Sequence, residues 1–205
     1  MTYRIGLISD IHASPAPLKE ALSIFKQQKV DMILCPGDIA GYGELLDETV
    51  ELLIESQCQS ILGNHEVWHL NKSGNNDNAT TSYFNQLPDY LEFSIEGKKI
   101  YMVHANPPNS YEGGIRLLDE HGCIVSEQKT DWTKRLAEFD YDVLIVGHTH
   151  QVFAERLGSM LVINPGSTTY NHSCAILKLP DKSVQFFALS NIPIVKSWNW
   201  GTNQI

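Results

Sequence analysis

The sequence predicts an α/β protein in which short strands alternate with helices. Three short apolar runs in the first third of the chain have the length of buried strands: residues 3–9, 32–34 and 60–62. The two segments between them space their apolar residues as a helix does, one opened by Ser14 and Pro15 and the other spanning residues 44–55. Alternation of this kind indicates a parallel sheet with helices on its outside.

The rest of the chain is predicted to be richer in strands. Its elements are, in order, a polar loop, the two strands of a hairpin, an aperiodic stretch rich in Pro and Gly, a helix and a strand: residues 71–82, 90–95, 98–103, 105–126, 130–139 and 143–146. Four more strand-like segments follow: residues 152–157, 160–163, 175–179 and 184–189. No repeat or linker divides the chain, so we expect a single domain spanning residues 1–205.

Composition and charge limit the classes of partner. The chain has 205 residues, of which 42% are hydrophobic and 19% are charged, as in a globular protein with a sizeable core. Its 15 basic and 24 acidic side chains give a net charge of −9, so we expect no extended nucleic-acid surface, which normally needs a basic excess. A small anionic substrate is compatible with this charge, because bound dications reverse the field locally.

The sequence indicates neither a membrane segment nor an export signal. No apolar run approaches the roughly 18 residues that span a bilayer, and the N-terminus lacks the parts of a signal peptide. The four cysteines are far apart and form no CxxC pair: Cys35, Cys58, Cys123 and Cys174. We therefore expect a cytoplasmic protein with free, mostly buried thiols.

Polar residues gather where the predicted strands end. Five successive strands are each followed by oxygen or imidazole side chains: Asp10 and His12, then Asp38, then Asn64 and His65, then His104, then His148 and His150. Functional groups of open α/β sheets lie just beyond the carboxyl ends of the strands. We therefore expect these residues to form one cluster.

The residue types in this cluster are ligands of first-row transition metals. Apart from His65, the cluster has two carboxylates, one amide and four imidazoles, which suit Mn, Fe, Co, Ni or Zn, and the lack of cysteine argues against a structural zinc site. Each short motif has a plain structural interpretation as well, since Gly37-Asp38 and Gly63-Asn64 are ordinary turn dipeptides. Their occurrence at five successive strand ends favours a metal site.

Other candidate residues have simpler interpretations. We expect His69, His121 and His172 in surface or loop positions, and Trp68 and Trp132 in the core. Residues 75–78 lack the spacing of a calcium-binding loop and are predicted to form a solvated turn.

The order and spacing of the cluster resemble the calcineurin-like metallophosphoesterase superfamily. Its motifs Asp-x-His, Gly-Asp, Gly-Asn-His-Asp/Glu, His and Gly-His-x-His are matched by Asp10-Ile11-His12, Gly37-Asp38, Gly63-Asn64-His65-Glu66, His104 and Gly147-His148-Thr149-His150. The turn Asn164-Pro165-Gly166-Ser167 resembles the small bacterial and archaeal phosphodiesterase branch, so the resemblance covers about residues 5–168. It implies a four-layer αββα sandwich with two central mixed β-sheets.

The resemblance also implies a division of the ligands between two metals. One metal would be held by Asp10, His12, Asp38 and His150, and the other by Asp38, Asn64, His104 and His148, with Asp38 as the bridge. His65 would contact the metal ligands and face the substrate as a catalytic residue. We expect manganese first, with Fe, Ni, Co or Zn as alternatives. Two such metals, about 3.5–4 Å apart, can hold a hydroxide that attacks phosphorus in line.

One position departs from the superfamily pattern. Many members carry an Asp or Arg three residues after the Gly-Asp aspartate, and the Asp orients the motif histidine. This chain has Gly41, within Gly41-Tyr42-Gly43, which resembles the small phosphodiesterase branch and not the protein phosphatases. We expect these glycines to leave room beside the metals, and we expect diesterase activity to exceed monoesterase activity.

The expected activity is hydrolysis of a small phosphoester or nucleotide. A nucleotide phosphomonoesterase and a dinucleoside polyphosphate hydrolase are alternatives within the enzyme class. A scaffold without catalysis, like the retromer subunit of the same fold, is the alternative from another class. The scaffold interpretation requires loss of metal ligands, whereas every ligand position here is filled.

Overall fold

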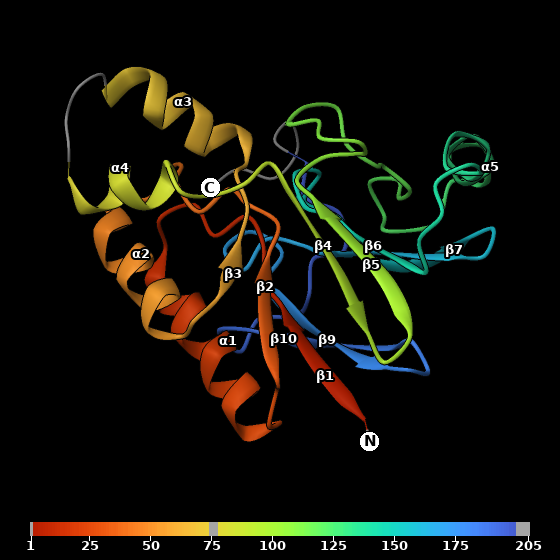
Figure 1. Cartoon of the computed structure of the whole chain (residues 1–205), viewed down its shortest axis with the longest axis horizontal. Helices are drawn as coiled ribbons and strands as arrows, with labels where there is room; N and C mark the ends of the chain where they lie inside the picture. Colours follow the sequence, from red (N-terminus) through yellow and green to blue (C-terminus); the bar gives the residue numbers. More distant parts are fainter. Residues whose placement is uncertain (1, 74–77, 200–205) are drawn as a thin grey trace.

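Two five-stranded sheets packed face to face form the centre of the molecule (Figure 1). The computed structural model describes residues 2–73 and 78–199. In the first sheet the strand order is β10-β9-β1-β2-β3, with β1 (Tyr3–Leu7), β2 (Met32–Cys35), β3 (Gln59–Ser60), β9 (Ser173–Leu179) and β10 (Ser183–Ala188). Strands β1, β2 and β3 are parallel, as their alternation with helices predicted, and β9 joins β1 in antiparallel register.

The second sheet is mixed as well. Its order is β4-β5-β6-β8-β7, with β4 (Tyr90–Ile95), β5 (Lys98–Val103), β6 (Val143–Ile145), β7 (Val152–Leu157) and β8 (Met160–Pro165). The predicted hairpin is confirmed as the antiparallel pair β4–β5, whereas β5, β6 and β8 run parallel. Parallel strands in both sheets therefore deliver their carboxyl ends to the same region.

Helices complete four layers. The helices of the first half lie beside the first sheet, and α5 lies beyond the second sheet (Figure 1): α1 (Pro15–Gln27), α2 (Leu46–Glu55), α3 (Asn64–Ser73), α4 (Ala79–Phe84) and α5 (Ser126–Arg135). The predicted αββα sandwich is confirmed. Within the described residues, no helix is both long and apolar enough to cross a membrane.

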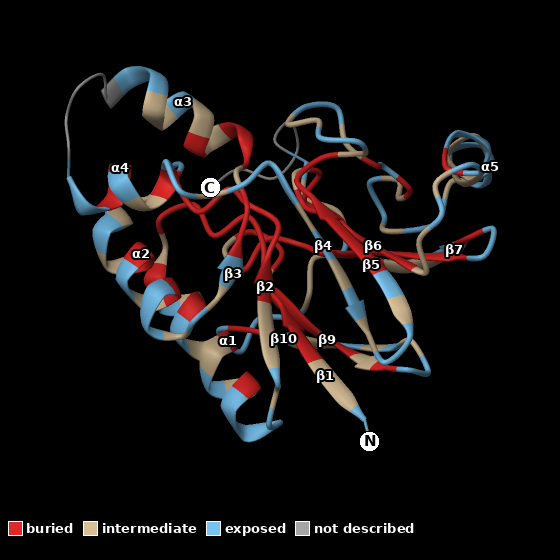
Figure 2. Cartoon of the chain, viewed as in Figure 1, coloured by how far each residue is buried: buried red, intermediate tan, exposed pale blue. Residues whose placement is uncertain are grey.

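Three apolar clusters hold the layers together. Strand β1 lies between two of these clusters, because its successive residues face opposite sides of the sheet. Ile5 and Leu7 face the second sheet, and Gly6 points to α1, where a Cβ would lie 2.7 Å from the ring of Phe25. The third cluster lies between the second sheet and α5, and Leu136 packs into it. Figure 2 shows burial concentrated in the strands and in the loops that follow them.

Two predicted elements were wrong in their bounds. The predicted loop at 71–82 contains the end of α3 and the start of α4, because Asn78 caps α4 by accepting a hydrogen bond from the Thr81 backbone N–H at 2.7 Å. The helix predicted at 130–139 spans Ser126–Arg135. Its periodic residue Leu136 packs in the core just beyond the helix end, which explains the shift. The turn predicted at 75–78 lies outside the described residues except for Asn78.

The side-chain predictions were mixed. Trp68 is 47% exposed, so its placement in the core was wrong, whereas Trp132 is partly buried against the outer cluster. His121 is exposed, and His69 and His172 are partly buried. All four cysteines are free, with two buried, one half-buried and one exposed.

Candidate metal centre

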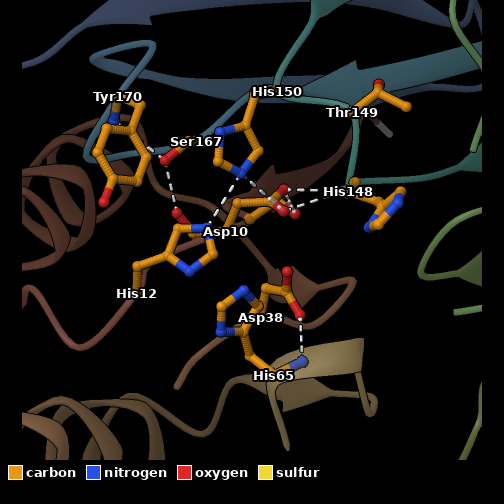
Figure 3. A network of polar contacts seen from close by, with 12 residues as sticks. Asp10, His12, Asp38, His65, His148, Thr149, His150, Ser167 and Tyr170 are labelled. Carbon is orange, nitrogen blue, oxygen red and sulfur yellow. Dashed lines mark hydrogen bonds and ion pairs between the residues drawn. The ribbon is translucent and has the colours of Figure 1, made fainter. Parts of the chain in front are cut away.

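The predicted ligands lie together where strands of both sheets end, and Figure 3 shows five of them: Asp10, His12, Asp38, His148 and His150. We call two sets of them group A (Asp10, His12 and His150) and group B (Asp38, Asn64, His104 and His148). Donor atoms of group A lie within 4.8 Å of one another, and so do those of Asp38, His104 and His148 in group B. The Asn64 Oδ1 atom joins group B at 3.1 Å from His104 Nε2 and 3.0 Å from His148 Nδ1.

The backbone is strained at most of these residues. Five of them have φ between 49° and 65°, in the left-handed region: Asp10, His12, Asp38, His148 and His150. Residues other than glycine seldom adopt this conformation, and it costs about 1 kcal/mol or more for each. Strain repeated at five clustered polar residues indicates a functional constraint on where their side chains point.

In group A the donor nitrogens are turned toward one another. His12 donates from Nδ1 to the Ala40 carbonyl at 3.2 Å, which leaves its Nε2 lone pair facing His150 Nε2 at 3.0 Å. The same His150 nitrogen lies 3.5 Å from Asp10 Oδ1. Two ring nitrogens and a carboxylate converging on one point fit a metal ion, which would accept all three lone pairs.

Group B follows the same plan. His104 donates from Nδ1 to the Pro36 carbonyl at 2.7 Å, so its Nε2 atom faces the Asn64 oxygen and Asp38 Oδ1, the latter at 3.4 Å. Backbone carbonyls that fix the tautomer of a histidine in this way are usual partners of metal ligands. The donor set of group B therefore fits a second metal ion.

Burial and neighbouring charges set the protonation of the cluster. Burial lowers the pKa of His12 and of His148 to about 4. Burial opposes the charge of His104 as well, but Asp38 outweighs it and raises the pKa of that ring to about 9. Despite burial, histidine neighbours hold the pKa values of Asp10 and Asp38 below their ordinary range, so both carboxylates are ionised.

His65 contacts the ligand residues and lies on the side of the cluster that faces the solvent. Its backbone N–H donates to Asp38 Oδ1 at 3.0 Å, and its ring is half-buried. Its ring centroid lies 4.8 Å from His12, 4.9 Å from Tyr42 and 4.8 Å from Trp68. Packing among these rings holds the ring of His65, since position 41 is a glycine and carries no side chain that could orient it.

Gly41 itself does not leave room beside the cluster, so that expectation was wrong. A Cβ atom on Gly41 would overlap the Nδ1 atom of His12, and the residue has φ of 149°. The imidazole of His12 fills the space, and it occupies the region that a side chain at position 41 would need.

Glu66 lies within one of the motifs, but no role was predicted for it. The side chain is fully buried, and its carboxylate accepts hydrogen bonds from the backbone N–H groups of Asp38 at 2.8 Å, Ala40 at 2.7 Å and Gly63 at 2.8 Å. Burial, followed by the charge of Asp38, raises its pKa to about 7. Glu66 thus ties the loop after β2 to the loop after β3. The sequence shows an acidic residue next to His65, but it does not show which backbone N–H groups this carboxylate binds.

The turn at Asn164–Ser167 supports the cluster from the other side. Ser167 Oγ donates to the Asp10 carbonyl at 2.6 Å, and Asn164 Nδ2 donates to the Gly147 carbonyl at 2.9 Å. The turn therefore holds the backbone before Ile11 and before His148, one ligand segment from each sheet.

Comparison with known proteins agrees with the superfamily that the sequence motifs indicate. Residues 3–182 match the model of the calcineurin-like phosphoesterase superfamily domain. An uncharacterised protein of Methanocaldococcus jannaschii is 29% identical over 79% of this chain and 68% of its own length, and a phosphodiesterase of that organism is 24% identical over 80% and 82%.

A solved structure agrees with these sequence matches. The metallophosphoesterase from Sphaerobacter thermophilus shares the fold with a TM-score of 0.69 and 24% identity, over 90% of this chain and 87% of its own. Because the family model spans most of the sequence and its motif residues converge in space, the chain belongs to the calcineurin-like phosphoesterase superfamily and is a phosphoric ester hydrolase.

Proposed function

We propose that this hydrolase is a dinuclear enzyme that cleaves phosphodiesters, with one metal in group A, one in group B and Asp38 between them. The observation that carries the proposal is the position of Asp38. A carboxylate oxygen of Asp38 lies within 4.8 Å of donor nitrogens of His12 and His65, and also within 4.8 Å of those of His104 and His148. One side chain therefore reaches both groups, which supports its role as the bridge.

The bound metals would supply an activated water and positive charge for the phosphate. The chain supplies the rest. Asp10 and Asp38 remain ionised and so keep charge available for the ions, while His12 enters as a neutral ring. Every ligand position holds a suitable donor, which supports an enzyme over a scaffold.

His65 is the residue that acts on substrate. Burial lowers its pKa, so the ring is neutral near pH 7 and donates a hydrogen bond from its N–H group. Its place beside His12 and Asp38 directs that donor to the leaving or non-bridging oxygen of a phosphate held at the cluster. A hydrogen bond of this kind to an oxygen that gains charge in the transition state typically contributes about 10²–10³-fold.

A cavity beside His148 supports a diester over a monoester. It has a volume of 270 Å³, and Arg116 and Trp198 are among its lining residues. A diester carries a second substituent on phosphorus, and this cavity is lined by His148 of group B. A phosphomonoester would leave it without substrate.

Paired assays test the proposal. The protein loaded with Mn²⁺ should contain two metals per chain and hydrolyse bis(p-nitrophenyl) phosphate with a higher kcat/KM than p-nitrophenyl phosphate. Omission of the metal should abolish both reactions. A clear preference for the monoester would contradict the diesterase assignment, and metal binding without any turnover would favour the scaffold.

A further inference from the structure

Two large aromatic side chains are exposed beside His65. Tyr42 is 57% exposed and Trp68 is 47% exposed. Their rings approach the same imidazole: that of Tyr42 at 4.9 Å between centroids, edge-to-face, and that of Trp68 at 4.8 Å, tilted. Exposed aromatic rings that flank a site are typical of surfaces that bind a ligand, because they gain most when water leaves them.

The fold fixes both rings relative to the metal ligands. Tyr42 lies between two glycines whose backbone packs against His12. The Gly43 N–H donates to the His12 carbonyl at 3.0 Å, and a Cβ on Gly43 would lie 2.6 Å from that oxygen. The ring of Tyr42 consequently lies 5.1 Å from that of His12. Trp68 is four residues after Asn64 on α3, so one helical turn separates it from a group B ligand.

The two rings therefore lie beside His65, the residue that would contact a phosphate at the metal centre. We infer that they bind the base of a nucleoside phosphodiester whose phosphate occupies the metal centre. The inference rests on the proposed function for the position of the phosphate. It also goes beyond that function, since it selects nucleotides from all phosphodiesters and identifies Tyr42 and Trp68 as specificity residues.

Charge supports a base as the group that is recognised. The protein has a net charge of −9, which opposes the approach of an anionic substrate at a distance. A nucleobase is neutral and planar, so stacking against Tyr42 and Trp68 adds affinity that this repulsion does not reduce. Stacking of one base on aromatic side chains typically changes binding by about 5-fold to 150-fold.

Ligand pairs that differ only in the base test the inference. The binding pair is adenosine 5′-phosphate and methyl riboside 5-phosphate, titrated by calorimetry into the Mn²⁺-loaded protein. The turnover pair is the methyl esters of the same two compounds, compared by kcat/KM. For the wild-type chain, both ratios should favour the base-bearing ligand by about tenfold.

Tyr42→Leu and Trp68→Leu should each lower these ratios by about 3-fold, and the double variant should bring them close to one. Both rings also contact His65, so the variants should slow hydrolysis of every ester, and only the ratio reports on the base. Tyr90→Leu is the matched control, because Tyr90 is 42% exposed and lies on β4. It should leave the ratios unchanged.

The outcomes separate the two proposals. Ratios near one in the wild-type protein, or equal ratios in wild type and the double variant, would overturn the inference even if diesters are hydrolysed. A binding preference for the adenosine compound that the double variant removes, without hydrolysis of any ester, would support the inference and overturn the proposed function. A preference for an alkyl diester over both test esters would indicate an apolar substituent in place of a base.

Discussion

His12 of group A and His104 of group B are alike in burial and in hydrogen bonding, yet they differ in protonation. Each is almost fully buried and donates from Nδ1 to a backbone carbonyl. Burial lowers the pKa of His12 to about 4, whereas Asp38, 3.4 Å from His104 Nε2, raises the pKa of His104 to about 9 despite burial.

The difference shows that a single carboxylate decides what each group must do to take up a metal. Group A presents His12 with its lone pair available at neutral pH. Group B presents His104 as a cation paired with Asp38, so a metal has to displace a proton there. The two groups should therefore respond differently to pH and to substitution, although their ligands are of the same types.

The largest expected effect is that of Asp38→Asn, which should remove metal binding from group A and from group B alike. An amide supplies no charge to either ion, so the variant should lose both metals and nearly all activity. Metal content by mass spectrometry and turnover of bis(p-nitrophenyl) phosphate check this. Asp140→Asn is the control, since Asp140 is highly exposed and pairs with Lys99. Two metals per chain in Asp38→Asn would refute the bridge.

The next effect is that of His65→Ala, which should leave both groups filled. The loss of its hydrogen bond should reduce kcat/KM for alkyl or nucleotide esters by about 10²–10³-fold and for nitrophenyl esters by less, because nitrophenolate spreads its charge over the ring and gains less from a hydrogen bond. His121→Ala, at an exposed position, is the matched control. Equal losses on both ester types would assign His65 to stabilisation of the phosphoryl charge. Loss of a metal would make it a ligand.

Glu66→Gln should have a smaller effect that reaches both groups. Its carboxylate binds the N–H of Asp38 in group B and the N–H of Ala40, whose carbonyl holds His12 in group A. An amide nitrogen in place of one oxygen leaves a buried N–H without an acceptor, at a cost of about 1–3 kcal/mol in the free energy of unfolding. Metal affinity should fall by about 10–100-fold.

Titration calorimetry and thermal unfolding, with Glu127→Gln on exposed α5 as the control, measure these changes. Unchanged metal affinity and unchanged stability in Glu66→Gln would show that the two loops hold their positions without this carboxylate.

The smallest expected effect is on the number of protons released when the metals bind. The pKa of His104 is raised to about 9, so below that pH the metal-free ring carries a proton that a metal must displace. Metal binding near pH 7 should release about one proton more than it does well above pH 9, because a proton lost from metal-bound water is released at both pH values, whereas that of His104 is released only at the lower one. Calorimetry in buffers with different ionisation enthalpies measures it. His12→Gln should keep this difference, and its disappearance in that variant would assign the proton to group A.

The architecture was predictable wherever a pattern within a few residues decided it. Apolar runs located the central strands, and the polar residues after the runs identified seven side chains that lie together in the structure, because parallel strands bring their carboxyl ends together. The short helix α4 was missed because it depends on a single cap at Asn78 within a polar stretch. Trp68 was misplaced because the exposed side of α3 follows from where the helix packs, which its sequence does not encode.

The supporting residues of the site were harder to predict. Glu66 acts through backbone groups of Asp38 and Ala40, which are 28 and 26 residues away in the chain, so no local pattern reveals them. Gly41 suggested an opening, but the space near it is filled by His12, which comes from another loop. Ligand identity is thus local information, whereas ligand support depends on contacts between distant loops.

The left-handed backbone at five clustered ligands has a consequence for engineering this chain. Glycine would adopt φ near 50° without the strain that Asp10 or His150 carries, so a selection for thermostability alone should favour replacing the very residues that would bind metal. Libraries of variants that are selected for thermostability should therefore keep these five residues unchanged.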